Sequence, residues 1–96
     1  MKSHTNDASI ERLLNAYNSG NTQKSLVISK YILCNTPELV LGWNILAITL
    51  ANLGRYEQSI QTFSRALILS PYNPHLCNNL GNALKSKGDL TRARRL

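Results

Sequence analysis

The sequence is poor in the residues that catalysis and metal binding need. Its 96 residues include only two histidines, two cysteines and five acidic residues. His75 and Cys77 stand at i, i+2 and do not share a helical face, so they do not form the start of a metal site. The five acidic residues are scattered along the chain, and the glycines form no phosphate-binding loop. We therefore expect no enzyme activity, no metal and no cofactor in this chain.

Long apolar runs are also missing. The most apolar stretch, residues 45–51, is far shorter than the about 20 residues that cross a bilayer. Residues 1–7 are polar, lack the apolar core of a signal peptide, and are expected to be disordered. Cys34 and Cys77 lie 43 residues apart without a redox motif, which is typical of small buried side chains in a reducing compartment. We expect a cytoplasmic protein with no membrane partner.

Acidic residues are scarcest near the end of the chain. The formal net charge is +6, and residues 84–96 carry five lysines and arginines against Asp89 alone, a net +4. A basic end can meet nucleic acid, acidic lipid or acidic peptide, or it can be a solvated helix face, which is the interpretation we favour. No aromatic residues alternate with these charges, and stacking on nucleic-acid bases needs them. Nucleic acid is therefore not the expected partner.

What the sequence does contain is a set of residues that recur at a constant spacing. Gly20, Gly54 and Gly88 are spaced by 34 residues, and so are Pro37 and Pro71. Between these markers the apolar residues recur at i, i+3, i+4 and i+7, which indicates one face of a helix. In the middle unit they are Trp43, Leu46, Ala47 and Leu50. The pattern predicts a helix, a tight turn with a left-handed glycine, a second helix and a proline stop.

The same pattern divides the chain into three units. They are an atypical first unit at residues 8–37, a second at 38–73 and a truncated third at 74–96. In the third unit Leu80, Gly81 and Leu84 repeat the middle stripe, and residues 87–90 repeat the turn. We therefore expect a turn at Gly88, followed by under two turns of helix. The open edge of this last unit favours either a longer protein or self-association with a second copy.

The middle unit resembles the tetratricopeptide repeat. The matching residues are Trp43, Leu46, Ser59 in place of the usual alanine, Phe63, Ala66 and Pro71. Ala47 and Leu50 depart from the glycine and tyrosine of the family but keep a small and a large side chain. The resemblance implies an all-α fold, a right-handed superhelix of about three helical hairpins of which the last is truncated.

The resemblance also implies a protein–protein interaction module. In this family the first helices of successive units line a concave groove that binds an extended peptide or a partner helix. The positions that match the groove here are Asn44, Ile48, Ala51, Asn52, His75, Asn78, Asn79, Asn82 and Lys85. In the atypical first unit the corresponding residues are Ile10, Leu14, Tyr17 and Asn18. Amides both donate and accept, so they suit a peptide backbone, while Lys85 and His75 would favour an acidic peptide.

The third unit carries a second hypothesis. Residues 77–85 resemble repeats of the O-linked N-acetylglucosamine transferases and their bacterial relatives, where inward asparagines hold the substrate backbone. The matching asparagine here is Asn79, while Ile45 and Glu11 occupy its place in the other units. The chain would then be the substrate-recruiting front of a larger glycosyltransferase- or sulfotransferase-like enzyme.

Overall fold

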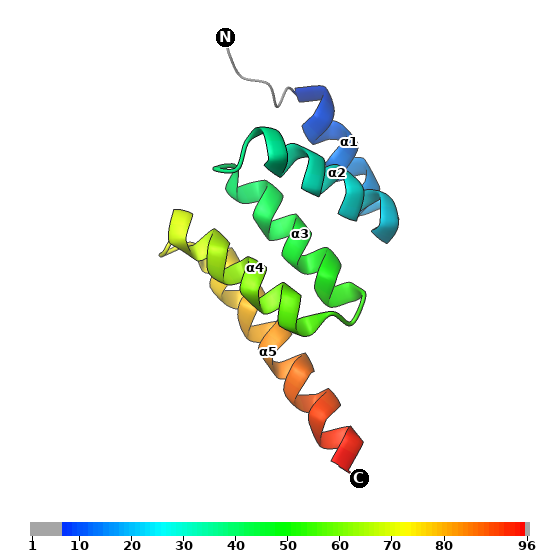
Figure 1. The fold of residues 1–96 in the computed structure, drawn as a ribbon, viewed down its shortest axis with the longest axis vertical. Helices are drawn as coiled ribbons and strands as arrows, with labels where there is room; N and C mark the ends of the chain where they lie inside the picture. The colour runs from blue at the N-terminus through cyan, green and yellow to red at the C-terminus, as the bar shows by residue number, and fades with distance from the viewer. Residues whose placement is uncertain (1–6, 96) are drawn as a thin grey trace.

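The computed structural model describes residues 7–95, and this part of the chain forms helices joined by short turns, with no strand. The helices are α1 (Asp7–Asn18), α2 (Thr22–Asn35), α3 (Val40–Asn52), α4 (Tyr56–Leu69) and α5 (Pro74–Arg95). Each packs mainly against the helices next to it in the chain, so the stack in Figure 1 is elongated, 54 × 28 × 19 Å. The expected all-α helical repeat is confirmed, and its right-handed winding stays a prediction.

The repeat spacing of the sequence is visible in the turns within the hairpins. Gly20 and Gly54 have φ angles of 77° and 79°, a left-handed conformation that glycine adopts without steric cost. The residues after them, Asn21 and Arg55, each donate their N–H to the carbonyl five residues earlier, at 2.9 Å in both turns. This is the hydrogen bond of a Schellman motif, and it ends α1 and α3 in the same way.

The turns between hairpins also repeat. Thr36 and Ser70 donate their N–H to the carbonyl four residues earlier, at 2.7 and 3.0 Å. Pro37 and Pro71 follow at once and prevent the helix from continuing, because proline has no N–H to donate. Because of these two stops, α3 and α5 occupy equivalent positions. Helix α3 follows the first hairpin, and α5 follows the second.

The expected turn at Gly88 is wrong. Helix α5 runs for 22 residues through this glycine, which does not adopt a positive φ, and Thr91 donates its hydroxyl to the carbonyl of Lys87 at 3.0 Å. The turn at Gly54 is followed by a helix of 14 residues that packs back on α3. A glycine permits a left-handed turn without requiring one, so a helix can also continue through it. The third unit is therefore one long helix.

Helix α3 is the centre of the core. It contributes to all three clusters of buried residues among the described side chains. One joins it to α4 and α5 (Ala47, Phe63, Ala66, Leu76, Ala83), one to α1 and α2 (Leu13, Ile32, Ile45), and one to α2 alone (Leu33, Leu46, Leu50). The first helices of the two hairpins therefore meet, as the repeat pattern requires.

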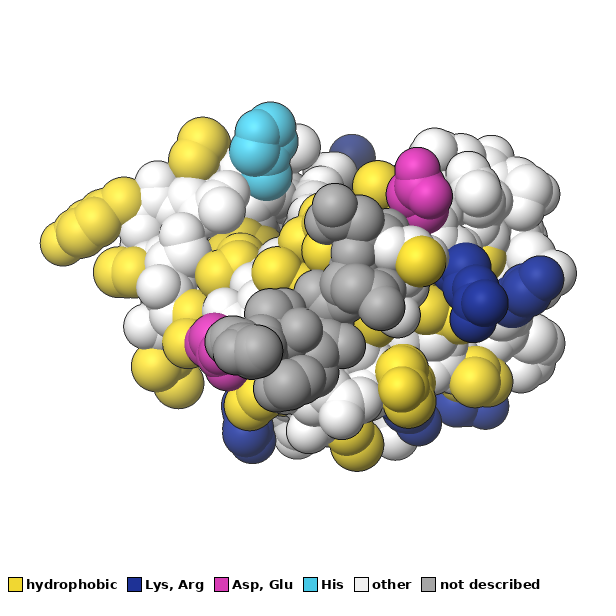
Figure 2. Space-filling model, turned by 90° about the horizontal axis from the view of Figure 1, so that it is seen from above, with side chains coloured by type: hydrophobic (Ala, Val, Ile, Leu, Met, Phe, Trp, Pro, Cys, Tyr) yellow, Lys and Arg dark blue, Asp and Glu magenta, His cyan; other side chains and the backbone are white. Residues whose placement is uncertain are grey.

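Apolar side chains also reach the surface. Seen from above, they appear in several separate places among polar atoms (Figure 2). Cys34 and Cys77 are both exposed free thiols, so the expectation that they are buried is wrong. Cys77 takes the repeat position of Trp43, but no described helix covers it. Cys34 takes the position of Ile68, which is 79% exposed on the outside of α4.

No helix within residues 7–95 combines the length and the apolar character needed to cross a membrane. The expected disordered start, residues 1–7, lies outside the described residues except for Asp7, with which α1 begins. The unit boundaries that the spacing predicts stay a prediction.

Candidate functional site

A polar hollow of about 440 Å³ lies where the first helices of successive units come together. Its walls come from α1, α3 and α5, and α4 adds part of the floor. The lining residues are Tyr17, Ile48, Ala51, Asn52, Tyr56, Phe63, Asn79, Asn82, Ala83 and Ser86. We call this hollow the groove.

Helix periodicity sets the two main walls. Helix α3 presents Ile48, Ala51 and Asn52 at i, i+3 and i+4, which is one face of the helix. Helix α5 presents four residues at i, i+3, i+4 and i+7, from Asn79 to Ser86. The opposite side of α3 packs against α2. This packing holds α3 in place while its groove face stays accessible.

Five of the residues that the sequence predicts in the second and third units line the groove. They are Ile48, Ala51, Asn52, Asn79 and Asn82. Asn44 does not line it but touches one of these residues, because the Nδ2 of Asn79 donates to the Oδ1 of Asn44 at 3.1 Å. This amide pair ties α3 to α5 beside the groove and fixes the orientation of both side chains.

The other predicted residues lie elsewhere. His75, Asn78 and Lys85 are exposed on α5 but do not line the groove. Successive helix residues are about 100° apart, so Asn78 points well away from the direction of Asn79. Binding by these three residues stays a prediction. In the first unit Tyr17 lines the groove, and the remaining candidates do not: Ile10, Leu14 and Asn18.

Four lining residues were missed from the sequence: Tyr56, Phe63, Ala83 and Ser86. Ser86 continues the spacing of the two asparagines, four residues after Asn82 and seven after Asn79, so an extension of the same stripe finds it. Tyr56 begins α4 directly after the turn at Gly54, and its spacing along the sequence is typical of a residue in the core. Its place beside the ends of the first helices is the signal that could have identified it.

The groove is electrically neutral, which differs from the mildly basic groove expected. None of its lining residues is charged; they offer amides, hydroxyls and aromatic or aliphatic surface. Amides and hydroxyls can both donate and accept, so the lining suits neutral polar groups such as a peptide backbone. No acidic residue, histidine or cysteine is among the residues that line the groove.

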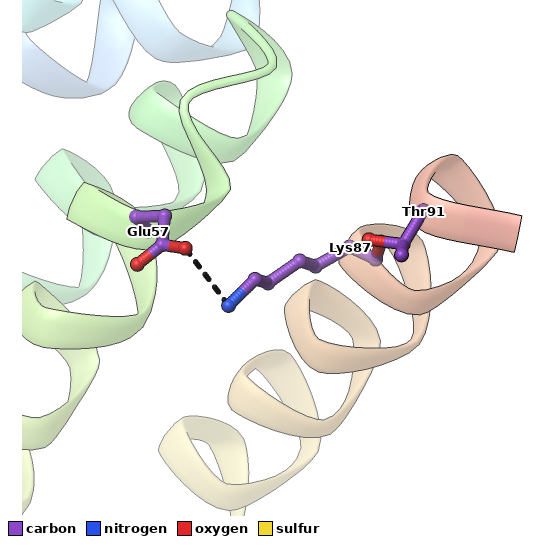
Figure 3. A network of polar contacts seen from close by, with 3 residues as sticks. All are labelled: Glu57, Lys87 and Thr91. Atoms are coloured by element: carbon purple, nitrogen blue, oxygen red, sulfur yellow. Dashed lines mark hydrogen bonds and ion pairs between the residues drawn. The ribbon is translucent and has the colours of Figure 1, made fainter. Parts of the chain in front are cut away.

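The basic half of α5 borders a separate hollow, of about 530 Å³, against the start of α4. Figure 3 shows the ion pair across it, in which Lys87 Nζ lies 3.0 Å from Glu57 Oε2. The two side chains are 42% and 76% exposed, so the pair is well solvated and contributes little stability. It does neutralise Lys87, which leaves Arg55 and Arg94 as the cations of this hollow.

Trp43 belongs to packing between the units. Its Nε1 donates to the carbonyl of Pro37 at 2.6 Å, and the guanidinium of Arg65 lies 5.3 Å from the ring centroid. The ring therefore closes the turn before α3 and holds α4 by a cation–π contact. In the described residues no group of three or more histidines, cysteines or acids is placed to hold a metal ion.

Comparison with known proteins gave one match. Residues 49–88 match the family model of the TPR repeat. The matched segment starts in α3, contains all of α4 and ends in α5. It is therefore longer than one full sequence repeat. Neither the curated proteins nor the solved structures gave a match to this chain. The match supports the resemblance to the tetratricopeptide repeat family that the spacing indicates.

Proposed function

We propose that this chain is a protein–protein interaction module whose groove binds an extended segment of a partner protein. Proteins with TPR repeats generally serve as non-catalytic scaffolds, and part of this chain matches that repeat. The observation that carries the proposal is the convergence of Asn52, Asn79 and Asn82 from two helices on one neutral hollow. Such a set recognises backbone groups rather than a particular charge.

The dimensions of the groove fit a peptide. Asn79 and Ser86 lie about 10 Å apart along α5, given a rise of about 1.5 Å per residue. An extended chain covers that distance in about three residues. Tyr17 and Tyr56 would then contact alternate side chains of the partner from the other walls of the groove. Binding of an extended segment uses these amides without distorting the stack.

A preference for acidic partners would arise outside the groove. His75 and Lys85 are exposed on α5 but do not line it, so they would meet only parts of a partner that continue past the groove. We propose the cytoplasm as the compartment, because the two exposed thiols of Cys34 and Cys77 persist as thiols in reducing surroundings.

The second hypothesis, the recruiting segment of a larger glycosyltransferase- or sulfotransferase-like enzyme, has less support. It depends on asparagines repeated in one register along the groove. Ile45 holds that register in α3 and is 2% exposed within the core, so it presents nothing to a ligand. Asn79 is the only asparagine among the three positions of this register, and it donates to Asn44. An interaction module is therefore the function that we propose.

The groove can be tested with a peptide selected from a random display library against the 96-residue chain. Asn52→Ala combined with Asn82→Ala should weaken binding of that peptide by about 1–3 kcal/mol, or roughly 5- to 140-fold in Kd, because two hydrogen bonds are lost. Fluorescence anisotropy measures the affinity. In NMR spectra the side-chain NH₂ signals of Asn52, Asn79 and Asn82 should shift when the peptide binds.

The matched control removes amides that lie outside the groove. Asn15→Ala combined with Asn35→Ala changes two exposed asparagines that do not line the groove, and it should leave the affinity within about twofold. Asn35 Nδ2 donates to the carbonyl of its own helix at Tyr31, so its loss should change no contact between helices. If the control pair weakens binding as much as the groove pair does, the groove is not the binding site.

A further inference from the structure

A hydrogen bond between two side-chain amides joins α3 to α5 at one end of the groove. Nδ2 of Asn79 donates to Oδ1 of Asn44 at 3.1 Å, and both side chains are partly buried. Asn44 lies one turn before Ile48, the first residue of α3 that lines the groove, and Asn79 is the first lining residue of α5. The two amides therefore mark the end of the groove that is nearest to the starts of both helices.

Stacking of the helices does not require polar groups at this place. One repeat earlier the equivalent positions hold Ile10 and Ile45, and Ile45 is 2% exposed within the core. A buried amide is unfavourable unless it is hydrogen-bonded, whereas the burial of isoleucine is favourable by itself. The chain thus has two amides where its own first unit boundary has two isoleucines, which favours a role in binding for Asn44 and Asn79.

The hydrogen bond decides which end of the Asn79 amide meets a ligand. A carboxamide is planar and carries its donors on nitrogen and its acceptor on oxygen. Because Nδ2 of Asn79 is directed at Asn44, the amide cannot turn over without breaking this bond. Its Oδ1 takes no part in the bond and keeps one position at the groove. A bound segment must supply a donor to this oxygen, and every residue except proline carries one in its backbone N–H.

We propose that Asn44 is a positioning residue of the groove: it holds Asn79 so that Oδ1 accepts the backbone N–H of a partner segment. Proline is then excluded at that residue of the segment. This inference rests on the proposed peptide binding and adds a specificity to it. Asn52 and Asn82 have exposed amides that can turn to present either end, so the orientation is fixed at Asn79.

Two substitutions of Asn44 test the positioning, because this residue does not itself line the groove. Asn44→Ala should weaken binding of the display-selected peptide by about 3- to 10-fold, the equivalent of up to one hydrogen bond, because Asn79 is then free to turn. Asn44→Asp should keep the affinity within about twofold, because a carboxylate only accepts and so imposes the same orientation on Asn79. Fluorescence anisotropy in about 0.5 M salt measures both variants with the added charge screened.

Amide-to-ester substitutions in the peptide locate the N–H that Asn79 recognises. Each ester replaces one backbone N–H by an oxygen that cannot donate. With the unchanged chain, one ester should weaken binding by about 3- to 10-fold through Asn79, and proline at that residue should weaken it at least as much. The same ester should weaken binding less than about twofold in the Asn79→Ala variant, and by an intermediate amount in Asn44→Ala. If the amide pair only supported the stack, its loss would weaken all these peptides equally.

A double substitution separates binding from folding. Asn44→Ile combined with Asn79→Ile copies the residues that the chain has one repeat earlier, Ile10 and Ile45. Its midpoint of urea unfolding should be no lower than that of the unchanged chain, since buried isoleucine needs no hydrogen bond. Its affinity for the peptide should nevertheless fall as far as that of Asn79→Ala. A lower midpoint would show that the amide pair is needed by the stack and would contradict the proposal.

The other outcomes that would overturn the proposal are equally specific. Unchanged affinity in Asn44→Ala would remove the role of this residue. Weakening by Asn44→Asp as large as by Asn44→Ala would mean that Asn44 donates to Asn79 instead. An ester profile that is the same in Asn79→Ala would assign the N–H to another residue. In each case, weaker binding by Asn52→Ala with Asn82→Ala would leave the proposed peptide binding intact; if that pair also has no effect, both proposals are wrong.

Discussion

Small hydroxyl residues form hydrogen bonds between neighbouring helices. Ser25 and Thr49 are each 2% exposed, and their hydroxyl oxygens lie 2.9 Å apart between α2 and α3. Ser59, 0% exposed, makes the corresponding contact between α4 and the backbone of α3. No side-chain polar atom buried within the described residues lacks a partner. The hydroxyls therefore add directed bonds between helices at little cost in volume.

A double-mutant cycle tests this coupling. Ser25→Ala and Thr49→Val should each lower the free energy of unfolding by about 1–2 kcal/mol, because each leaves the other hydroxyl buried with one partner fewer. The double variant should lose about 1 kcal/mol less than the sum, since no orphaned group remains. Urea unfolding measures all four proteins. Ser64→Ala, which removes an exposed hydroxyl on α4, should stay within about 0.5 kcal/mol, and strict additivity would refute the coupling.

The site shows what residue types alone can and cannot predict. Asn52, Asn79 and Asn82 were identified because amides at groove positions stand out in an apolar helix pattern. Lys85 and His75 were predicted because they match groove positions of the repeat family, but the direction of a side chain around a helix decides whether it enters a hollow. That direction depends on how α5 is rotated about its axis when it packs against α3 and α4. The sequence of α5 alone does not determine this rotation.

At the scale of elements, one residue type has two roles at the same repeat position. Gly20 and Gly54 end helices in a left-handed conformation, whereas Gly88 lies within α5. The sequence predicted all helices up to α4 because their turns combine glycine with a following helix long enough to pack back. It was wrong at Gly88 because a glycine permits a turn without requiring one. What decides is the packing that the following segment can supply.

Substitution of two glycines gives effects of opposite sign. Gly54→Ala should destabilise the chain by about 1–2 kcal/mol, because an alanine at a φ of 79° is strained. Gly88→Ala should stabilise it by up to about 1 kcal/mol, because alanine is the better helix former and has open space there. Thermal and urea unfolding measure both. Should Gly88→Ala destabilise like Gly54→Ala, α5 would have to turn at Gly88, as the spacing had predicted.

At the scale of the whole molecule, each helix is stabilised mainly by the helices next to it in the chain. The stack is long and thin, 54 × 28 × 19 Å, and its two ends share no cluster of buried residues. Helix α3 is the one helix that takes part in every cluster, so it couples the α1–α2 hairpin to α4 and α5. Such an array behaves as a sum of unit stabilities and interfaces rather than as a single compact core.

Hydrogen exchange distinguishes these two behaviours. Phe63→Ala empties a site that is 1% exposed in the α3–α4–α5 cluster, and Leu13→Ala empties one that is 0% exposed in the α1–α2–α3 cluster. Each should cost about 2–5 kcal/mol locally. Phe63→Ala should speed amide exchange most in α4 and α5, Leu13→Ala most in α1 and α2, with α3 accelerated by both. Equal acceleration of all helices by either substitution would mean that the chain unfolds as one cooperative unit, and coupling through α3 would then extend over the entire stack.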